Sequence, residues 1–206
     1  DKITQSLTNK IRKEMPEIDD ERAEVINYGL QILVGEVPKT FIMLAVAYLL
    51  GVFKLTLITF IILMPYRAFS GGFHLKTHIG CIISTCTFYC GVAILSKNIV
   101  IDYIVKYIIT IALGIFGIFM IRKYAPADTE DVPILSEKVR KQKQILSYIF
   151  FIIGLVVALI IKNNIISNLI IFGYLIQTCT ITKLTYRLTN NKYGYEVYKN
   201  TSEQMS

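Results

Sequence analysis

The sequence has no tryptophan and few charged residues, prolines or histidines. Of its 206 residues 18% are charged, and it holds 5 Pro, 12 Gly and 2 His. So little charge excludes an intrinsically disordered chain, and so little Pro and Gly excludes a collagen-like one. The four cysteines lie within or beside apolar segments, without the spacing of a disulfide framework or a zinc site. We therefore expect no disulfide scaffold, no metal and no other cofactor.

Apolar residues are abundant instead. Hydrophobic residues make up 53% of the chain, and the mean hydropathy is +0.51. This is more apolar than an ordinary soluble domain. A membrane helix needs about 20 apolar residues, so about six crossings would use about 120 residues. The composition predicts an all-α integral membrane protein with about six transmembrane helices, folded as a single polytopic membrane domain over 1–206.

The first segment, 1–24, is polar but carries an apolar stripe of Ile3, Leu7, Ile11 and Met15 beside basic residues. The i, i+4 spacing predicts an amphipathic interfacial helix that ends near Pro16. A solvated helix packed on a loop is the alternative.

The bundle is expected over 25–182 and a polar tail over 183–206. The first crossing carries Pro38 within it, where we expect a kink. The expected crossings are 25–53, 55–66, 79–96, 98–121, 145–161 and 163–182.

The net charge of +7 comes from 22 basic and 15 acidic residues. The basic residues lie between apolar runs rather than on one polar domain, which favours contact with membrane lipids over binding of nucleic acid. The N-terminal segment, the 67–78 and 122–143 connections and the tail are rich in Lys and Arg. The positive-inside rule therefore predicts a multi-pass cell-membrane protein with both termini and these connections in the cytoplasm. Tyrosines of the tail, among them Tyr186 and Tyr193, are expected to anchor it at the membrane interface.

The connection 67–81 holds both histidines of the chain and a cysteine, Cys81. A cysteine becomes a nucleophile when a histidine takes its proton. Cys81 also falls in the first turn of the expected 79–96 helix, where the helix dipole favours a thiolate and free N–H groups suit an oxyanion. A small packed hydrophobe is the alternative reading of Cys81. Cys86, Cys90 and Cys179 are expected to pack or to face lipid.

Two histidines compete for the role of base. His78 is three residues before Cys81 and shares its face if the helix covers both. His74 is seven residues before, which would be about 10.5 Å away along a continuous helix. His74 can therefore serve only if the chain is not helical there, and Gly71-Gly72 make a folded-back path plausible. Spacing leaves both histidines open.

The motif Arg67-x3-Gly71-Gly72-x-His74-x6-Cys81 resembles the signature of the AgrB family (accessory gene regulator protein B), the membrane cysteine endopeptidases of Gram-positive quorum sensing. A second element, Lys123-Tyr-Ala-Pro-Ala127 followed by Pro133-Ile134, is similar to that family's cytoplasmic loop. The resemblance covers most of the chain.

The resemblance implies that His74 and Cys81 are the catalytic pair, which removes the tie with His78, and that Arg67, Gly71 and Gly72 support the site. It implies a substrate, an AgrD-like precursor peptide whose acidic tail is removed, and a homodimer. Arg67 is a candidate for holding substrate carboxylates or backbone, with a lipid headgroup as the alternative partner. Asp128 and Glu130 are candidates for orienting His74. Candidate substrate-binding residues are Lys123, Lys138, Arg140 and Lys141. For the last three, the alternative role is to set the topology at the start of a span.

The sequence also allows a transporter as an alternative to an enzyme. Glu36, Lys39, Asp102 and Lys106 are charged residues within or beside apolar segments. Such residues often mark the pathway of a transporter, so a small exporter of peptides is the alternative function.

Overall fold

The computed structural model describes residues 2–15, 20–75, 77–130 and 133–204. Within these ranges the chain is helical and has no strand. The helices are α1 (Lys2–Glu14), α2 (Asp20–Leu49), α3 (Phe53–Ser70), α4 (His78–Asn98), α5 (Tyr103–Tyr124), α6 (Glu137–Ile160), α7 (Asn164–Thr180), α8 (Lys183–Leu188) and α9 (Gly194–Gln204). The predicted all-α fold is confirmed.

The helices α2 to α7 correspond in order to the six predicted crossings. By length and composition α3, α4, α5 and α6 are able to cross a membrane, and α7 is a shorter apolar helix of 17 residues. α2 has 30 residues and continues as helix through Pro38. The count of six is therefore approximate, whereas the membrane-protein class is supported.

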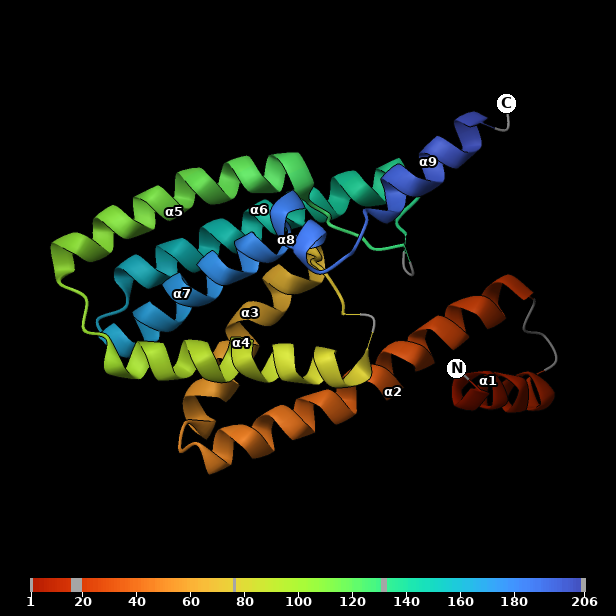
Figure 1. Cartoon of the computed structure of the whole chain (residues 1–206), viewed down its shortest axis with the longest axis horizontal. Helices are drawn as coiled ribbons and strands as arrows, with labels where there is room; N and C mark the ends of the chain where they lie inside the picture. Colours follow the sequence, from red (N-terminus) through yellow and green to blue (C-terminus); the bar gives the residue numbers. More distant parts are fainter. Residues whose placement is uncertain (1, 16–19, 76, 131–132, 205–206) are drawn as a thin grey trace.

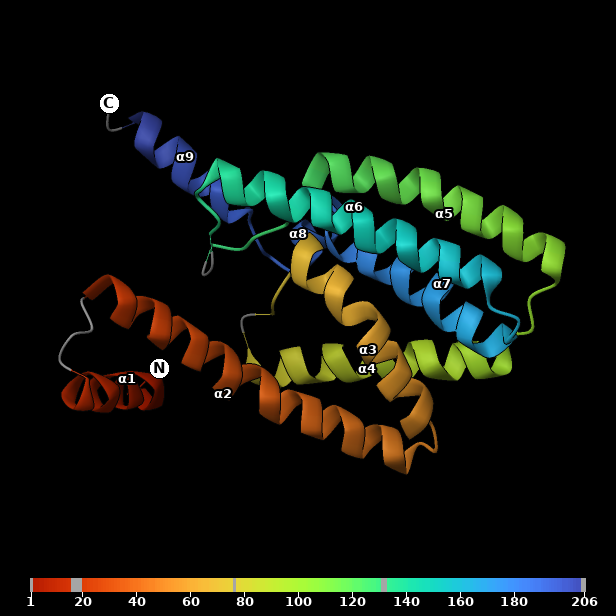
Figure 2. The ribbon, with the colours of Figure 1, turned by 180° about the vertical axis from the view of Figure 1, so that it is seen from behind.

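The bundle is arranged around α3 and α7. Figures 1 and 2 show α5, α6 and α7 running side by side, with α3 crossing between them and the pair α2 and α4. Tyr66, Phe151 and Tyr174, one from each of α3, α6 and α7, form a buried aromatic cluster with ring centroids 5.0–5.8 Å apart. Small residues permit this packing: Gly154 lies against the Tyr174 ring and Gly117 against Phe151. The core thus fixes the ends of α3 and α7 relative to each other.

Two predicted boundaries are wrong in a way that matters for the site. α3 continues to Ser70, so Arg67 lies in its last turn rather than in a loop. α6 begins at Glu137, so Lys138, Arg140 and Lys141 lie on helical turns that precede the apolar stretch. In both cases the helix extends past the apolar run, because polar residues at the end of a membrane helix still complete its backbone hydrogen bonds.

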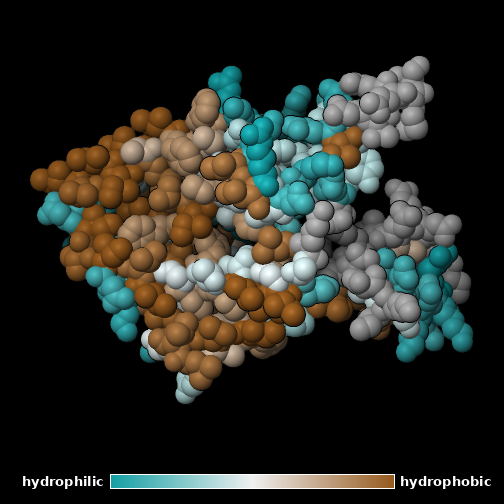
Figure 3. Space-filling model, in the orientation of Figure 1, coloured by the Kyte–Doolittle hydropathy of each residue, from teal (hydrophilic) through white to brown (hydrophobic). Residues whose placement is uncertain are grey.

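Polar residues gather at one end of the molecule. In Figure 3 the body of the bundle is hydrophobic, while hydrophilic residues cluster on the side that carries the α5–α6 connection and α1. The α3–α4 connection and α8 belong to the same end (Figure 1). The connections predicted to be rich in Lys and Arg therefore share one end of the bundle. Their assignment to the cytoplasm stays a prediction.

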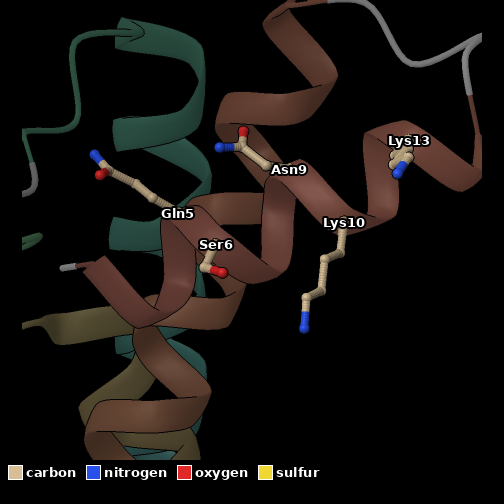
Figure 4. A pocket seen from close by; sticks show the side chains of 5 residues that line it. All are labelled: Gln5, Ser6, Asn9, Lys10 and Lys13. Carbon is tan, nitrogen blue, oxygen red and sulfur yellow. The ribbon is translucent and has the colours of Figure 1, made fainter.

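The predicted N-terminal helix is present as α1, which packs on α2. Among the α1 side chains that the structure describes, Thr4 and Thr8 are buried, and the Thr8 hydroxyl lies 3.4 Å from the Asn27 side-chain oxygen. The polar flank lines an open depression formed by Gln5, Ser6, Asn9, Lys10 and Lys13 (Figure 4). Leu7 and Met15 of the apolar stripe are exposed. α2 therefore covers the threonine face and leaves Leu7 and Met15 uncovered. Contact of α1 with a membrane surface stays a prediction.

Candidate active site at the polar end of the bundle

The structure brings together the two segments that carry the sequence motifs. Gly71, after α3, pairs with Ala127, after α5, in a short parallel bridge. The Gly72 N–H donates to the Ala127 carbonyl at 2.9 Å, and the Ala127 N–H donates to the Ser70 carbonyl at 2.8 Å. The connection before Cys81 is thus docked by backbone hydrogen bonds onto the Ala125-Pro126-Ala127 segment.

Both glycines of the first motif are required by this close approach. Gly71 has φ +72° and Gly72 has φ +141°, values that residues with a side chain rarely adopt. A Cβ at Gly71 would overlap the Ala127 carbonyl. A Cβ at Gly72 would overlap the guanidinium of Arg67 and the hydroxyl of Thr180. The glycine pair therefore allows backbone and guanidinium to pack where a side chain would stand.

Arg67 joins three parts of the site. Its Nη1 donates to the Thr180 hydroxyl at 3.0 Å and to Gln177 Oε1 at 3.3 Å, both at the end of α7. Its Nη2 donates to the Phe73 carbonyl at 3.0 Å. The Phe73 carbonyl belongs to the peptide that leads into His74. Arg67 is therefore directed into the protein, where it holds the chain next to His74, instead of pointing outward to substrate or lipid.

Gln177 is a site residue that sequence reasoning missed. Its side chain is fully buried, and its Nε2 donates to Ser70 Oγ at 3.0 Å and to the Gly71 carbonyl at 2.9 Å. Gln177 thus orients Arg67 with one atom and the glycine turn with the other. Gln177 could have been identified from the sequence, because it is a polar amide near the end of an apolar segment, and polar residues within membrane helices are often functional.

Cys81 lies where the sequence placed it, in the first turn of α4. Thr77 caps the helix by accepting from the Gly80 N–H at 3.2 Å, and the Cys81 N–H bonds to the Thr77 carbonyl at 2.9 Å. The amides of Gly80 and Cys81 therefore already donate hydrogen bonds within the helix. The amides of the first turn that suit an oxyanion are those of His78 and Ile79. The Cys81 side chain is half-buried.

The backbone around each histidine has the conformation that a role as base would need. His74 is exposed and lies outside any helix, between Gly72 and Thr77. His78 is the first residue of α4, so it shares a helical face with Cys81. Backbone geometry therefore keeps both as candidates for the base.

The other thiols lie on helices rather than near the start of α4. Cys86 and Cys90 lie farther along α4, and Cys179 lies at the end of α7. Cys90 is buried, with its sulfur 4.0 Å from the Met43 carbonyl oxygen. All four cysteines are free thiols. In the part of the chain that the structure describes, no three His, Cys, Asp or Glu residues gather as a metal site would require.

Asp128 organises the second connection. Its Oδ2 accepts from the N–H groups of Ile134 and Tyr195, each at 2.9 Å, and forms an ion pair with Arg140 at 3.1 Å. The Asp128 side chain is 1% exposed and that of Arg140 is 21% exposed. The Arg140 guanidinium also lies 4.3 Å from the centre of the Tyr195 ring.

The predicted substrate-binding residues differ in exposure. Arg140 is engaged within the protein, whereas Lys123, Lys138 and Lys141 are exposed. Glu130 pairs with Lys192 at 3.4 Å.

The tail folds back onto this connection. Tyr186 and Tyr193 are buried and stack with centroids 4.2 Å apart. The Tyr186 hydroxyl donates to the Asp128 carbonyl at 3.1 Å, and the Tyr193 hydroxyl donates to the Ile181 carbonyl at 2.9 Å. Burial raises the pKa of both hydroxyls, which keeps them neutral donors. The predicted interfacial anchor is therefore wrong for these two tyrosines, because their rings pack inward.

The four charged residues that suggested a transporter lie on two different helices. Glu36 and Lys39 are on α2, which packs against α4. Asp102 caps α5 by accepting from the Ile104 N–H, and Lys106 lies one turn later. α2 packs against α3 and α4, whereas α5 packs against α6 and α7. The four charged residues therefore do not form one cluster.

Replacing Gly72 by alanine is expected to destabilise the protein by about 2 kcal/mol, because the new Cβ displaces Arg67 and strains the backbone. Thermal unfolding of the purified protein in detergent measures the change. Gly91→Ala is the matched control, since nothing lies within 4 Å of a Cβ at Gly91. Equal unfolding temperatures for the two variants would contradict the role given to Gly72.

Comparison with known proteins agrees with the motif. The family described as Accessory gene regulator B matches residues 4–181. A putative AgrB-like protein of Listeria innocua is 29% identical over 192 residues, 92% of this chain and 91% of the relative. The accessory gene regulator protein B of Staphylococcus aureus is 29% identical over 161 residues, 78% of this chain and 83% of the relative. No solved structure matches the chain.

The family match spans the motif residues from Arg67 to Cys81, the second connection and all six helices of the bundle. The resemblance read from the sequence is confirmed. The chain belongs to the accessory gene regulator B family, and its function is therefore related to quorum sensing.

Proposed function

We propose that this protein is a membrane-embedded cysteine endopeptidase that removes the C-terminal tail of an AgrD-like precursor and promotes closure of a thiolactone ring. The observation that carries the proposal is the docked α3–α4 connection. Gly71 and Gly72 hold it on Ala127, and Arg67 holds the peptide next to His74, a few residues before Cys81. A nucleophile and a base need such fixed supports to react efficiently.

The first step is acyl transfer to the enzyme. The Cys81 thiol gives its proton to His74, and the sulfur attacks the carbonyl carbon of the peptide bond before the acidic tail. The carbon–nitrogen bond then breaks, and His74 returns the proton to the leaving amine. The tail departs, and the rest of the precursor stays on Cys81 as a thioester. The amides of His78 and Ile79 are the candidate donors to the oxyanion.

The second step closes the ring. The thiol of the precursor's own cysteine attacks the thioester carbonyl, and its proton passes through His74 to the Cys81 sulfur. The product is a thiolactone at the same energy level as the thioester, so the exchange needs no other energy source. Water competes with the thiol, which favours a site at the edge of the membrane where water is scarce.

Exposed basic residues provide the electrostatic part of substrate binding. Lys123, Lys138 and Lys141 lie on the end of α5 and the start of α6, and their exposed charges attract an acidic tail. Arg140 is omitted from this set because Asp128 pairs with it. The site faces the cytoplasm in this proposal, where a newly made precursor meets it, and the functional unit is a homodimer.

The proposal is tested by giving an AgrD-like peptide, with an amphipathic leader, a central cysteine and an acidic tail, to the purified protein in liposomes. Mass spectrometry detects the released tail and the cyclised product. Cys81→Ala is expected to abolish both, because no thioester forms. Cys86→Ala is the matched control from the same helix and is expected to keep wild-type activity. Normal cleavage by the Cys81→Ala protein would refute the proposed cysteine endopeptidase.

A further inference from the structure

The tail contacts the second connection at three points. The Tyr186 hydroxyl donates to the Asp128 carbonyl at 3.1 Å, and the Tyr195 N–H donates to the Asp128 carboxylate at 2.9 Å. Gly194 lies so close to Thr129 that a Cβ at this glycine would overlap the Thr129 carbonyl. The middle of the second connection is therefore held by a segment that lies far from it in the sequence.

Stacked tyrosine rings extend this contact to the start of the second connection. The Tyr193 ring stacks on Tyr186 with centroids 4.2 Å apart and on Tyr124 with centroids 5.9 Å apart. Tyr124 is the last residue of α5, after which the second connection begins. Tyr186 is 1% exposed, so separating the stacked rings would expose a large apolar surface to water. The tail therefore contacts the second connection both at Tyr124 and at Asp128.

Asp128 follows directly after Ala127, the residue that docks the glycine turn. The Ala127 carbonyl accepts from the Gly72 N–H at 2.9 Å. The peptide unit between Ala127 and Asp128 is planar and stiff, so a displacement of Asp128 also moves the Ala127 carbonyl. The position of the glycine turn, which leads to Cys81, therefore depends on the contacts that the tail makes with Asp128.

We propose that Tyr186 is a positioning residue for the reaction, because its hydroxyl fixes the segment on which the connection before Cys81 is docked. The proposal rests on the proposed function, since it concerns how the same nucleophile and base are held. Tyr186 acts through Asp128 and Ala127 and exchanges no proton with the substrate. Its contribution is geometric, since a misplacement of about 1 Å between reacting groups can lower a rate about 100-fold.

Hydrogen exchange without a precursor tests whether the tail holds the glycine turn. Tyr186→Phe keeps the stacked ring and removes only the hydroxyl that donates to Asp128. The full-length protein in detergent is placed in deuterated buffer, and mass spectrometry follows the peptides that contain Gly72 and Ala127. Exchange of these two amides is expected to be about tenfold faster than in wild type, because their hydrogen bonds open more often.

Precursor cleavage in liposomes tests whether the same contact serves the reaction. Tyr186→Phe is expected to lower kcat about tenfold and to leave KM within about twofold of wild type, because the exposed lysines that attract the substrate are unchanged. Gly194→Ala disturbs the same docking from another point, since its Cβ pushes the tail away from Thr129. It is expected to change both the exchange and kcat in the same direction, and it decides the question alone if Tyr186→Phe does not fold.

Tyr174→Phe is the matched control. Tyr174 is also buried, and its hydroxyl donates to the Phe150 carbonyl at 3.2 Å within the bundle. This variant is expected to keep the exchange of Gly72 and the value of kcat within about twofold of wild type. Wild-type exchange at Gly72 in Tyr186→Phe, or equal kcat values for Tyr186→Phe and Tyr174→Phe, would overturn the proposal. Because exchange is measured without a precursor, this failure is distinct from normal cleavage by Cys81→Ala.

Discussion

Replacing His74 by alanine is expected to lower the rate of precursor cleavage about 10³-fold, the range of a lost general base. His78→Ala is expected to retain wild-type activity within about threefold. The reason is that His74 is the histidine of the family motif and that Arg67 fixes the peptide leading into it. The liposome assay with the AgrD-like peptide measures both rates.

Imidazole added to the His74→Ala protein provides the decisive control. A small base that fills the vacated position is expected to restore part of the cleavage, which loss of a merely structural residue would not allow. Cleavage that survives in His74→Ala and disappears in His78→Ala would reverse the assignment, since the helical spacing of His78 and Cys81 also permits that pair.

Replacing Asp128 by alanine is expected to destabilise the polar end of the protein by about 3 kcal/mol. The change leaves the Arg140 charge without its partner and removes the acceptor of the Ile134 and Tyr195 N–H groups. Because Arg140 is 21% exposed, we expect the lower end of the range for a broken buried pair. Thermal unfolding in detergent measures the loss, and trypsin is expected to cut the released tail at Lys183, Arg187 and Lys192.

Glu130→Ala is the matched control for Asp128→Ala. Glu130 pairs with the exposed Lys192 on the same connection, and such a surface pair contributes less than about 1 kcal/mol. An Asp128→Ala protein as stable as Glu130→Ala, with a tail as resistant to trypsin as in wild type, would show that the buried ion pair does not hold the tail.

The contacts of Asp128 and Glu130 also bear on which group orients the catalytic base. Asp128 and Glu130 were the candidates for orienting the base, but Asp128 is engaged with Arg140, Ile134 and Tyr195, and Glu130 with Lys192. The charged group that the structure places beside the connection leading to Cys81 is Arg67, which holds the Phe73 carbonyl.

Several features followed from the sequence because they depend on local patterns. Apolar runs of membrane-helix length predicted the bundle, and the six helices α2 to α7 lie where those runs lie. Thr77, His78 and Cys81 are within one turn of each other, so the start of α4 and the position of Cys81 could be read locally. Helix ends were misplaced at Ser70 and Glu137, because polar residues extend a membrane helix without adding to its apolar signal.

The sequence by itself determined the class of protein, the order of the helices and the segment that carries Cys81, since composition and short-range spacing are properties of the chain. Only the tertiary structure decided which distant residues meet there. Ala127 comes from the second connection and Gln177 from α7, and no spacing in the sequence links either residue to the glycine turn before Cys81. Helix packing brings them together, because buried polar groups must find partners wherever the fold supplies them.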